Sequence, residues 1–206
     1  MARPRAFDED RVLDAAMECF WGRGLEATSI RDLSAEMGIN CPSLYNAFGD
    51  KRALFALALE RYATCFMRER IGRLERHPSP KQAIRIYLDE VIERSLTDPQ
   101  QRGCFIVNSA MDVPPDATEL RAAVCGYLTE IEGFFRGRLE AALALGEIPA
   151  TIAPEPVGRL FFAVMLGIRV AARARPERAL LEDMARPALA LLDHPAPESM
   201  SMKGKP

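Results

Sequence analysis

Apolar residues recur at spacings of three and four along most of the chain, and no convincing stretch of them alternates with a period of two. This spacing predicts an all-α protein with about nine helices. The first apolar stripe consists of Val12, Leu13, Ala16, Met17 and Phe20. Gly22 and Gly24 follow it and can end a helix, so we expect the first helix over about residues 8–22.

Two short helices are predicted next, with a tight turn at Gly38 between them. Thr28 or Ser29 offers a hydroxyl cap for the first of the two, and Asn40 can cap the second, over residues 41–48. Three short helices joined in this way within the first 50 residues are typical of a helix-turn-helix unit.

The remaining chain carries longer apolar stripes between proline-containing breaks. We expect a helix of about 30 residues after Pro114-Pro115, and further helices over about 51–76, 80–97, 104–111, 156–174 and 176–193. The predicted organisation is a helix-turn-helix domain over 1–52, a larger helical domain over 53–194 and a flexible tail over 195–206.

The composition suits a folded cytoplasmic protein. Of its 206 residues, 49% are hydrophobic and 27% are charged, which excludes intrinsic disorder. The longest nearly apolar stretch, 160–168, is far shorter than the roughly 20 residues that a membrane helix needs. The first basic residues are followed by acidic ones and not by an apolar secretory stretch. We therefore expect no membrane segment and a cytoplasmic location.

Side chains that bind metals or perform catalysis are scarce. The five cysteines are scattered without a C-x-x-C pair, and the two histidines, His77 and His194, lie beside prolines. This pattern disfavours a disulfide framework, a structural zinc site and most hydrolase mechanisms. We expect no metal, no cofactor and no enzymatic activity, with a helical enzyme that uses the larger domain as its active site as an alternative.

Residues 28–51 read TSIRDLSAEMGINCPSLYNAFGDK, with a hydroxyl residue opening the second helix, Gly38 at the turn, and then Leu-Tyr-x-x-Phe-x-x-Lys from Leu44 to Lys51. This pattern resembles the signature of the TetR family of transcriptional regulators, and the resemblance covers about residues 8–60. A shorter phrase, GCFIVNSA over 103–110, resembles a Gly-Cys-Leu-type motif in one branch of that family.

The resemblance implies a homodimeric repressor of transcription that binds a palindromic operator in double-stranded DNA. A small-molecule inducer or an oxidant acting on the C-terminal domain would release it, and the helix over 51–76 would link the two domains. The N-terminal residues of a recognition helix can reach base edges in the major groove, so the base-facing candidates are Cys41, Pro42 and Ser43. The candidates for phosphate contacts are Thr28, Ser29, Arg31, Tyr45, Asn46 and Lys51, with Arg3 and Arg5 on an N-terminal arm.

The charge of this predicted DNA-binding part is unusual for a nucleic-acid partner. Residues 1–52 carry 7 Lys/Arg against 9 Asp/Glu, whereas such surfaces normally have a basic excess. Asp8, Glu9, Asp10 and Asp14 would have to lie on the far side of the first helix. A protein-interaction scaffold that keeps the fold without binding DNA is therefore a second alternative.

An inducer pocket is implied by the family architecture. A mostly apolar lining favours a hydrophobic or aromatic small molecule, with Asn108 as the polar anchor, although each lining residue taken singly also suits a plain core. The predicted lining consists of Phe55, Phe66, Tyr87, Val91, Phe105, Asn108, Met111, Tyr127, Ile131 and Phe134.

Two cysteines are candidates for a thiol switch. Cys104 follows Gly103 at the start of a short helix, where the helix dipole can make a thiol more reactive, and Cys41 lies in the recognition helix. The alternative for both is an inert, packed side chain.

The last two predicted helices have extensive apolar faces, and Gly158 and Gly167 would allow helices to approach closely. A two-fold four-helix interface would bury these faces and place two recognition helices one DNA turn apart. In the alternative, the faces simply cover the long helix. The predicted interface residues are Val157, Leu160, Phe161, Val164, Gly167, Ile168, Leu180, Met184 and Leu191.

Overall fold

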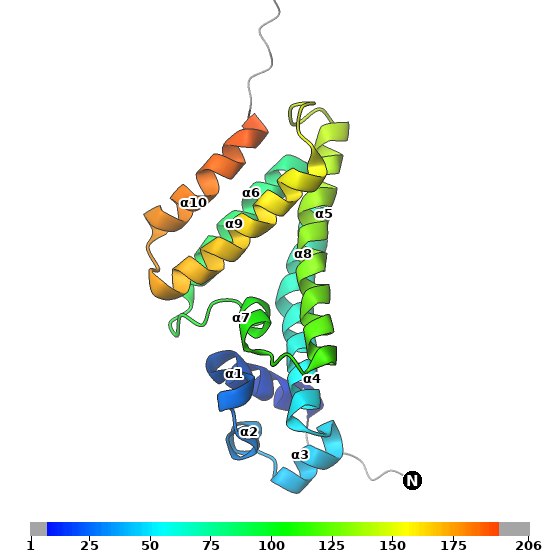
Figure 1. The fold of residues 1–206 in the computed structure, drawn as a ribbon, viewed down its shortest axis with the longest axis vertical. Coiled ribbons are helices and arrows are strands. Elements are labelled where there is room, and N and C mark those ends of the chain that lie inside the picture. The colour runs from blue at the N-terminus through cyan, green and yellow to red at the C-terminus, as the bar shows by residue number, and fades with distance from the viewer. Residues whose placement is uncertain (1–7, 194–206) are drawn as a thin grey trace, which may run out of the picture.

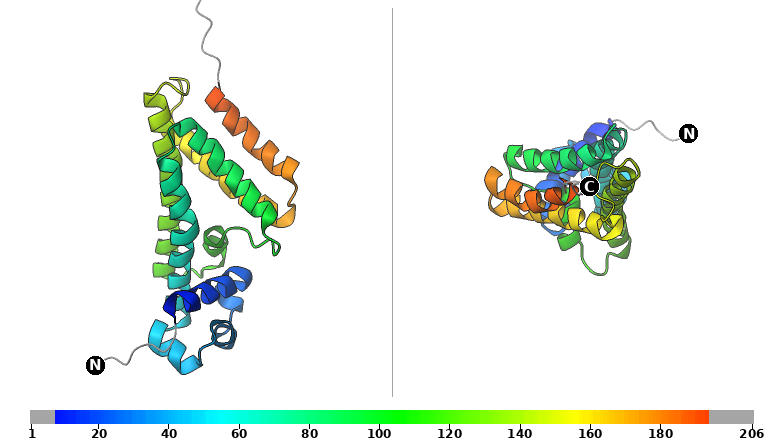
Figure 2. Two further views of the ribbon diagram at one scale, coloured as in Figure 1. Left: turned by 180° about the vertical axis from the view of Figure 1, so that it is seen from behind. Right: turned by 90° about the horizontal axis from the view of Figure 1, so that it is seen from above.

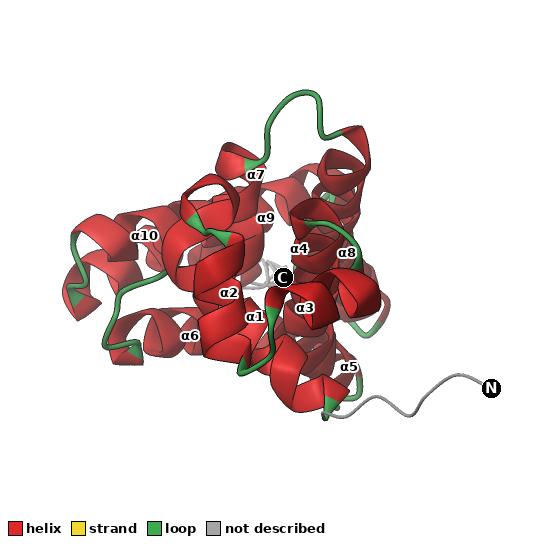
Figure 3. Cartoon of the chain, turned by 90° about the horizontal axis from the view of Figure 1, so that it is seen from below, coloured by secondary structure: helices red, strands yellow, loops and turns green. Residues whose placement is uncertain are grey.

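The computed structural model describes residues 8–193, and this part of the chain contains helices and connecting loops but no strand (Figure 3). The predicted arm with Arg3 and Arg5, His194 and the predicted tail over 195–206 lie outside the described residues. The all-α prediction is confirmed for the described range. None of its helices is both long enough and apolar enough to cross a membrane.

The helices are α1 (Glu9–Ala27), α2 (Ile30–Met37), α3 (Cys41–Phe48), α4 (Lys51–Tyr62), α5 (Glu69–Glu75), α6 (Pro80–Thr97), α7 (Phe105–Asp112), α8 (Thr118–Ala144), α9 (Pro154–Ala174) and α10 (Arg178–Ala190). A π-helical segment, Ala63–Arg68, joins α4 to α5 without a break, and a 3-10 turn, Leu191–Asp193, follows α10. With α4, the π segment and α5 counted as one rod, the described range holds nine helices, as predicted.

The first helix continues beyond its predicted end. Gly24 has a φ of +82° and ends the continuous helical geometry close to the predicted stop, and only a short helical stretch follows it as far as Ala27. The glycines that predicted a stop therefore mark a kink within α1.

Helices α1–α3 form one end of the elongated molecule, with α3 at its extremity (Figure 1). Leu33 from α2 and Leu44 from α3 are fully buried; α2 packs against α1, and α3 packs against α2. Gly38 adopts a left-handed conformation with φ +65° at the turn between α2 and α3, as the sequence predicts.

The other end is built from α6, α8, α9 and α10. Figure 2 shows that α6, α9 and α10 run obliquely to the long α8. Helices α8 and α9 make the most extensive contact, because a Cβ on Gly158 would lie only 3.1 Å from the backbone nitrogen of Arg136. Phe135 and Phe161 stack in this contact with ring centroids 5.8 Å apart.

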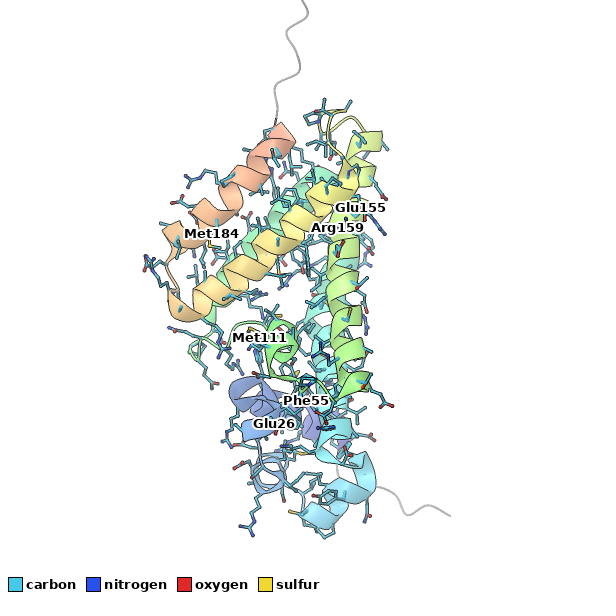
Figure 4. All side chains as sticks on the ribbon, viewed as in Figure 1. Glu26, Phe55, Met111, Glu155, Arg159 and Met184 are labelled. Atoms are coloured by element: carbon cyan, nitrogen blue, oxygen red, sulfur yellow. The ribbon has the colours of Figure 1, made fainter. Side chains whose placement is uncertain are left out.

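Two residues of the predicted dimer interface are instead core residues of the single chain. Phe161 and Ile168 are fully buried, so they pack inside the molecule and present no surface to a partner. Gly167 approaches α10 of the same chain, where its Cβ would meet the methyl carbon of Met184 at 3.1 Å, and Figure 4 shows Met184 on α10 beside α9. Of the other predicted positions, Leu160 is exposed and Val157, Val164, Leu180, Met184 and Leu191 are partly buried.

Candidate DNA-binding surface and effector cavity

Helix α3 presents polar and small side chains at the end of the molecule. Leu44 and Phe48 anchor it from within, while Pro42, Tyr45 and Asn46 are exposed. The Asn40 side chain accepts a hydrogen bond from the Ser43 backbone N–H at 2.9 Å and caps the helix. Cys41 and Ser43 are partly buried beside it. The N-terminal turn of α3 is therefore a rigid, accessible surface.

The Thr28 hydroxyl, predicted to contact a DNA phosphate, instead forms a hydrogen bond within the protein. Thr28 is fully buried and its Oγ1 donates to the Gly24 carbonyl oxygen at 2.6 Å, so its side chain cannot reach DNA. Ser29 is the residue that caps α2, in a reciprocal capping box with Asp32, and it stays exposed. Arg31, two residues further on, is also exposed.

Lys51 lies at the start of α4 and points back to the end of α1. Its Nζ donates to the Thr28 carbonyl at 3.2 Å and to the Glu26 carbonyl at 3.5 Å. An ammonium group has three donors, so one remains for a further acceptor. Asp50 caps α4 by accepting from the Ala53 backbone N–H at 2.8 Å.

The acidic start of α1 is neutralised by α4. Arg61 donates to Asp10 at 2.6 Å and to Asp14 at 2.8 Å, which draws both carboxylates toward α4. The Asp8 side chain caps α1 by accepting from the Asp10 backbone N–H at 3.1 Å. These contacts account locally for much of the acidic excess that the sequence shows over residues 1–52.

A cavity of about 20 Å³ lies between the π segment, α6, the start of α7, α8 and α9. This volume gives room for about one water-sized group. The lining residues are Tyr62, Phe66, Met67, Arg70, Tyr87, Arg94, Cys104, Ile106, Ile131, Met165 and Arg169.

Only three of the ten predicted pocket residues, Phe66, Tyr87 and Ile131, line this cavity. Met111 was expected in the pocket but is 67% exposed, on the outer side of α7 (Figure 4). Asn108 was expected as the polar anchor, but its Nδ2 donates to the Arg102 carbonyl at 2.7 Å and fastens the loop before α7.

The other five predicted positions lie in the core outside the cavity. Tyr127 is buried and donates its hydroxyl to Glu60 Oε2 at 2.9 Å. The remaining four are buried apolar side chains, namely Phe55, Val91, Phe105 and Phe134.

Tyr62 is central to the aromatic wall of the cavity. Its ring meets Trp21 of α1 at a centroid distance of 5.1 Å and Phe66 at 5.1 Å. Its hydroxyl donates to Cys104 Sγ at 3.7 Å. Burial raises the pKa of Tyr62 far above its ordinary value, so the phenol stays neutral. Cys104 is buried at the N-cap of α7, which places the candidate thiol in the cavity wall.

The sequence interpretation missed the arginines of this cavity. Arg94 lies in α6 three residues after the buried Val91, and Arg169 lies in α9 next to the buried Ile168. Helical periodicity places these arginines on the core-facing side of their helices. A pattern that considers only apolar residues leaves them out.

A charged junction ties α1 to the loop before α7. The guanidinium carbon of Arg102 lies 3.8 Å from the centroid of the Trp21 ring, and its Nε is 3.2 Å from Asp98 Oδ2. Arg102 also forms an ion pair with Glu18 of α1. One turn away, a Cβ on Gly24 would meet Asp112 Oδ2 at 2.8 Å. The wall that contains Cys104 therefore adjoins the helix that supports α2 and α3.

Two family models match separate parts of the chain. Residues 12–58 match the family model described as "Bacterial regulatory proteins, tetR family". Residues 80–188 match the model "Tetracyclin repressor-like, C-terminal domain".

Similar curated proteins include the HTH-type transcriptional repressor ComR of Escherichia coli, 29% identical over 172 residues, which cover 83% of this chain and 82% of ComR. The uncharacterized HTH-type transcriptional regulator YezE of Bacillus subtilis is 36% identical over 143 residues, or 68% of this chain and 73% of YezE. Among solved structures, a cysteine mutant of the TetR family regulator CifR in complex with 26-bp operator DNA is 36% identical. Its TM-score is 0.82, and the match covers 91% of this chain and 98% of that one. These similarities favour a DNA-binding regulator over the scaffold and the helical enzyme.

Proposed function

Because the chain belongs to the TetR family and is a DNA-binding transcriptional regulator, we propose that it acts as a repressor. A homodimer would bind a palindromic operator through two copies of α3, and a chemical signal would release it. In this proposal residues 1–52 form the DNA-binding domain and residues 53–194 the effector and dimerisation domain. The exposed N-terminal turn of α3, anchored by two buried side chains at the end of the molecule, carries the proposal.

The proposed contacts follow from accessibility. Cys41, Pro42 and Ser43 open α3 and would face base edges, where a proline offers apolar contact and a serine hydroxyl can donate or accept. The proposed phosphate contacts are Ser29, Arg31, Tyr45, Asn46 and Lys51. Thr28 is excluded from this set by its burial.

The proposed dimer interface is the apolar outer face of α9 and α10. Leu160 is 41% exposed there, and the partly buried Val157, Val164 and Met184 continue the face. Glu155 and Arg159 lie on α9 beside α8, where Arg159 pairs with Glu132 at 3.1 Å (Figure 4). A dimer through this face doubles the base contacts that a single α3 can make.

The proposed signal acts at the cavity. Tyr62 and Phe66 connect the cavity to α4, and Trp21 connects it to α1. A ligand that binds a second arrangement of these helices more tightly shifts the population away from the DNA-competent one, by no more than its differential affinity. Oxidation of the Cys104 thiol would disturb the same wall.

Gel shift with operator fragments from the chain's own upstream region, at about 100 mM salt, tests the proposal. We expect saturable binding to one fragment, weakened by Tyr45→Ala and unaffected by Arg175→Ala, whose ion pair with Glu177 is remote from α3. Failure to bind any upstream fragment would contradict regulation of the neighbouring genes. Equal effects of the two variants would contradict the assigned surface.

The thiol switch is tested in the same assay with and without hydrogen peroxide. Cys104→Ser should keep DNA binding under oxidation if Cys104 is the switch, and Cys41→Ser is the matched variant in α3. Release of the Cys104→Ser protein by peroxide would clear Cys104 of this role.

A further inference from the structure

The cavity carries positive charge that no carboxylate of the described chain balances. Arg70, Arg94 and Arg169 all line it. Arg70 is paired, because its Nε donates to Glu90 Oε2 at 3.0 Å. Within residues 8–193, neither Arg94 nor Arg169 forms an ion pair with an aspartate or a glutamate.

Arg169 is the more deeply buried of the two, with 4% of its surface exposed. Its Nη1 donates to Ser95 Oγ at 3.1 Å, and that hydroxyl in turn donates to the Val91 carbonyl at 2.7 Å. A guanidinium has five N–H donors, so one neutral hydroxyl uses only a small part of its hydrogen-bonding capacity.

Arg94 is partly compensated by aromatic rings. Its guanidinium carbon lies 3.9 Å from the Phe66 centroid and 5.7 Å from the Trp21 centroid. Burial lowers the pKa of Arg94, and the positive charges of Arg169 and Arg70 lower it further. Arginine nevertheless stays protonated in proteins, so both residues bring a positive charge to the cavity wall.

A buried charge is costly unless a counter-charge and hydrogen bonds satisfy it. We propose that Arg94 and Arg169 form an anion site that holds the carboxylate of a small organic acid, and that this acid is the signal of the regulator. The second half of this statement rests on the function proposed above. Two guanidinium groups suit a carboxylate, because its two oxygens accept paired N–H donors.

The rest of the wall suits a hydrocarbon or aromatic tail. Tyr62, Phe66 and Ile131 supply apolar surface around the two arginines. Of the lining residues, Phe66, Arg70 and Arg94 are only partly buried, so they mark the entrance. The present volume of about 20 Å³ holds about one water-sized group, so the carboxylate and its tail can enter only by displacing Phe66.

Displacement of Phe66 links binding of the acid to the position of the DNA-binding helices. Phe66 and Met67 belong to the π segment, and Tyr62 is the last residue of α4, whose first residue is Lys51 at the DNA-binding end. An acid that opens the cavity therefore moves the helix that carries α3 and would lower operator affinity.

The test compares acids with their neutral amides by thermal unfolding of the full-length protein at constant ionic strength. The probes are sodium acetate and sodium benzoate against acetamide and benzamide. We expect the acids to raise the melting temperature and the amides to leave it unchanged. Arg94→Gln and Arg169→Gln should each weaken benzoate binding at least about tenfold, because a charge-assisted pair is lost. Arg175→Gln, an exposed arginine at the end of α9, should bind benzoate like the wild type.

A second variant tests the unpaired charge without any ligand. Arg169→Met keeps much of the side-chain volume and removes the charge, so in the absence of acid it should melt at or above the wild-type temperature. A clearly lower melting temperature would show that Arg169 is satisfied by the protein itself, and would overturn the anion site.

Stabilisation by amides equal to that by acids, failure of both acids, or wild-type benzoate affinity in both glutamine variants would each overturn the proposal. Operator binding by the acid-free protein tests the regulatory function separately. Acids that stabilise the protein through Arg94 and Arg169 but leave the DNA complex intact would support the site and refute its role as the signal.

Discussion

Replacing Arg102 with alanine should destabilise the protein by about 3 kcal/mol, because Arg102 holds the junction between α1 and α7. Its side chain is 15% exposed and pairs with Asp98, whose side chain is 9% exposed. The same guanidinium covers the Trp21 ring at 3.8 Å and reaches Glu18.

The magnitude follows from these three contacts. Loss of a pair that is mostly buried costs less than the 3–5 kcal/mol of a fully buried pair but more than a surface pair, and we take ~1.5 kcal/mol. The cation–π contact adds about 1 kcal/mol. Glu18 is half exposed, so its pair adds about 0.5 kcal/mol.

Urea unfolding at pH 7 and fixed protein concentration measures the loss, provided that the m-value is unchanged. Arg175→Ala is the control, and it should unfold like the wild type because its pair with Glu177 is exposed.

Burial raises the pKa of Asp98, but hydrogen bonds from Arg102 and from the backbone outweigh it and bring the pKa below its ordinary 3.8. This stabilisation exists above pH 3.8 and disappears as pH falls through the folded-state pKa, so the difference between wild type and Arg102→Ala should shrink in acid. A loss no greater than that of the control would refute the reasoning.

Three further outcomes are expected. Tyr45→Phe should weaken operator binding about fivefold at every sequence without changing how the affinity depends on salt concentration, whereas Lys51→Gln should lower the slope of log affinity against log salt by about one. Fluorescence anisotropy titrations at several salt concentrations measure both, and unchanged values would remove these residues from the phosphate contacts. Burial and the hydrogen bond to Glu60 raise the pKa of Tyr127 to about 12, so wild-type stability should fall between pH 10 and 12 by about 1–2 kcal/mol more than that of Tyr127→Phe; parallel pH curves would contradict this. Leu160→Glu should give folded monomers by light scattering, whereas Leu57→Glu, at a matched exposure of 42% against 41%, should stay dimeric; a dimeric Leu160→Glu protein would place the interface elsewhere.

The parts of the fold that depend on neighbouring residues could be predicted from the sequence. Ser29, Asn40 and Asp50 each cap a helix through a backbone N–H three residues ahead, and such contacts are visible in a linear pattern. The left-handed Gly38 is equally local. The helix-turn-helix arrangement follows from these signals together.

The composition of the cavity could not be predicted in the same way. Its wall combines Tyr62, Arg94, Cys104 and Arg169, which come from four separate segments. Periodicity identifies the apolar face of a helix but not the helix against which that face packs. Met111 shows the same limit, because it fits the spacing of α7 and yet points to solvent. The assignment of Phe161 to a dimer interface failed for this reason as well.

The π segment between α4 and α5 has a consequence for how this chain can change in length. A π turn holds one more residue than an α turn over nearly the same rise, so it is equivalent to a single-residue insertion that the helix has absorbed. Each residue of an α-helix turns the chain by about 100°. Loss of one residue within 63–68 would let this segment return to α-helix while Glu69–Glu75 keeps nearly the same phase against Lys51–Tyr62. Loss of one residue from a regular α-helical part of the rod would instead rotate its two halves by about that angle. This short stretch is therefore the part of the rod where the loss of a single residue leaves the apolar faces of both halves directed at the same neighbours.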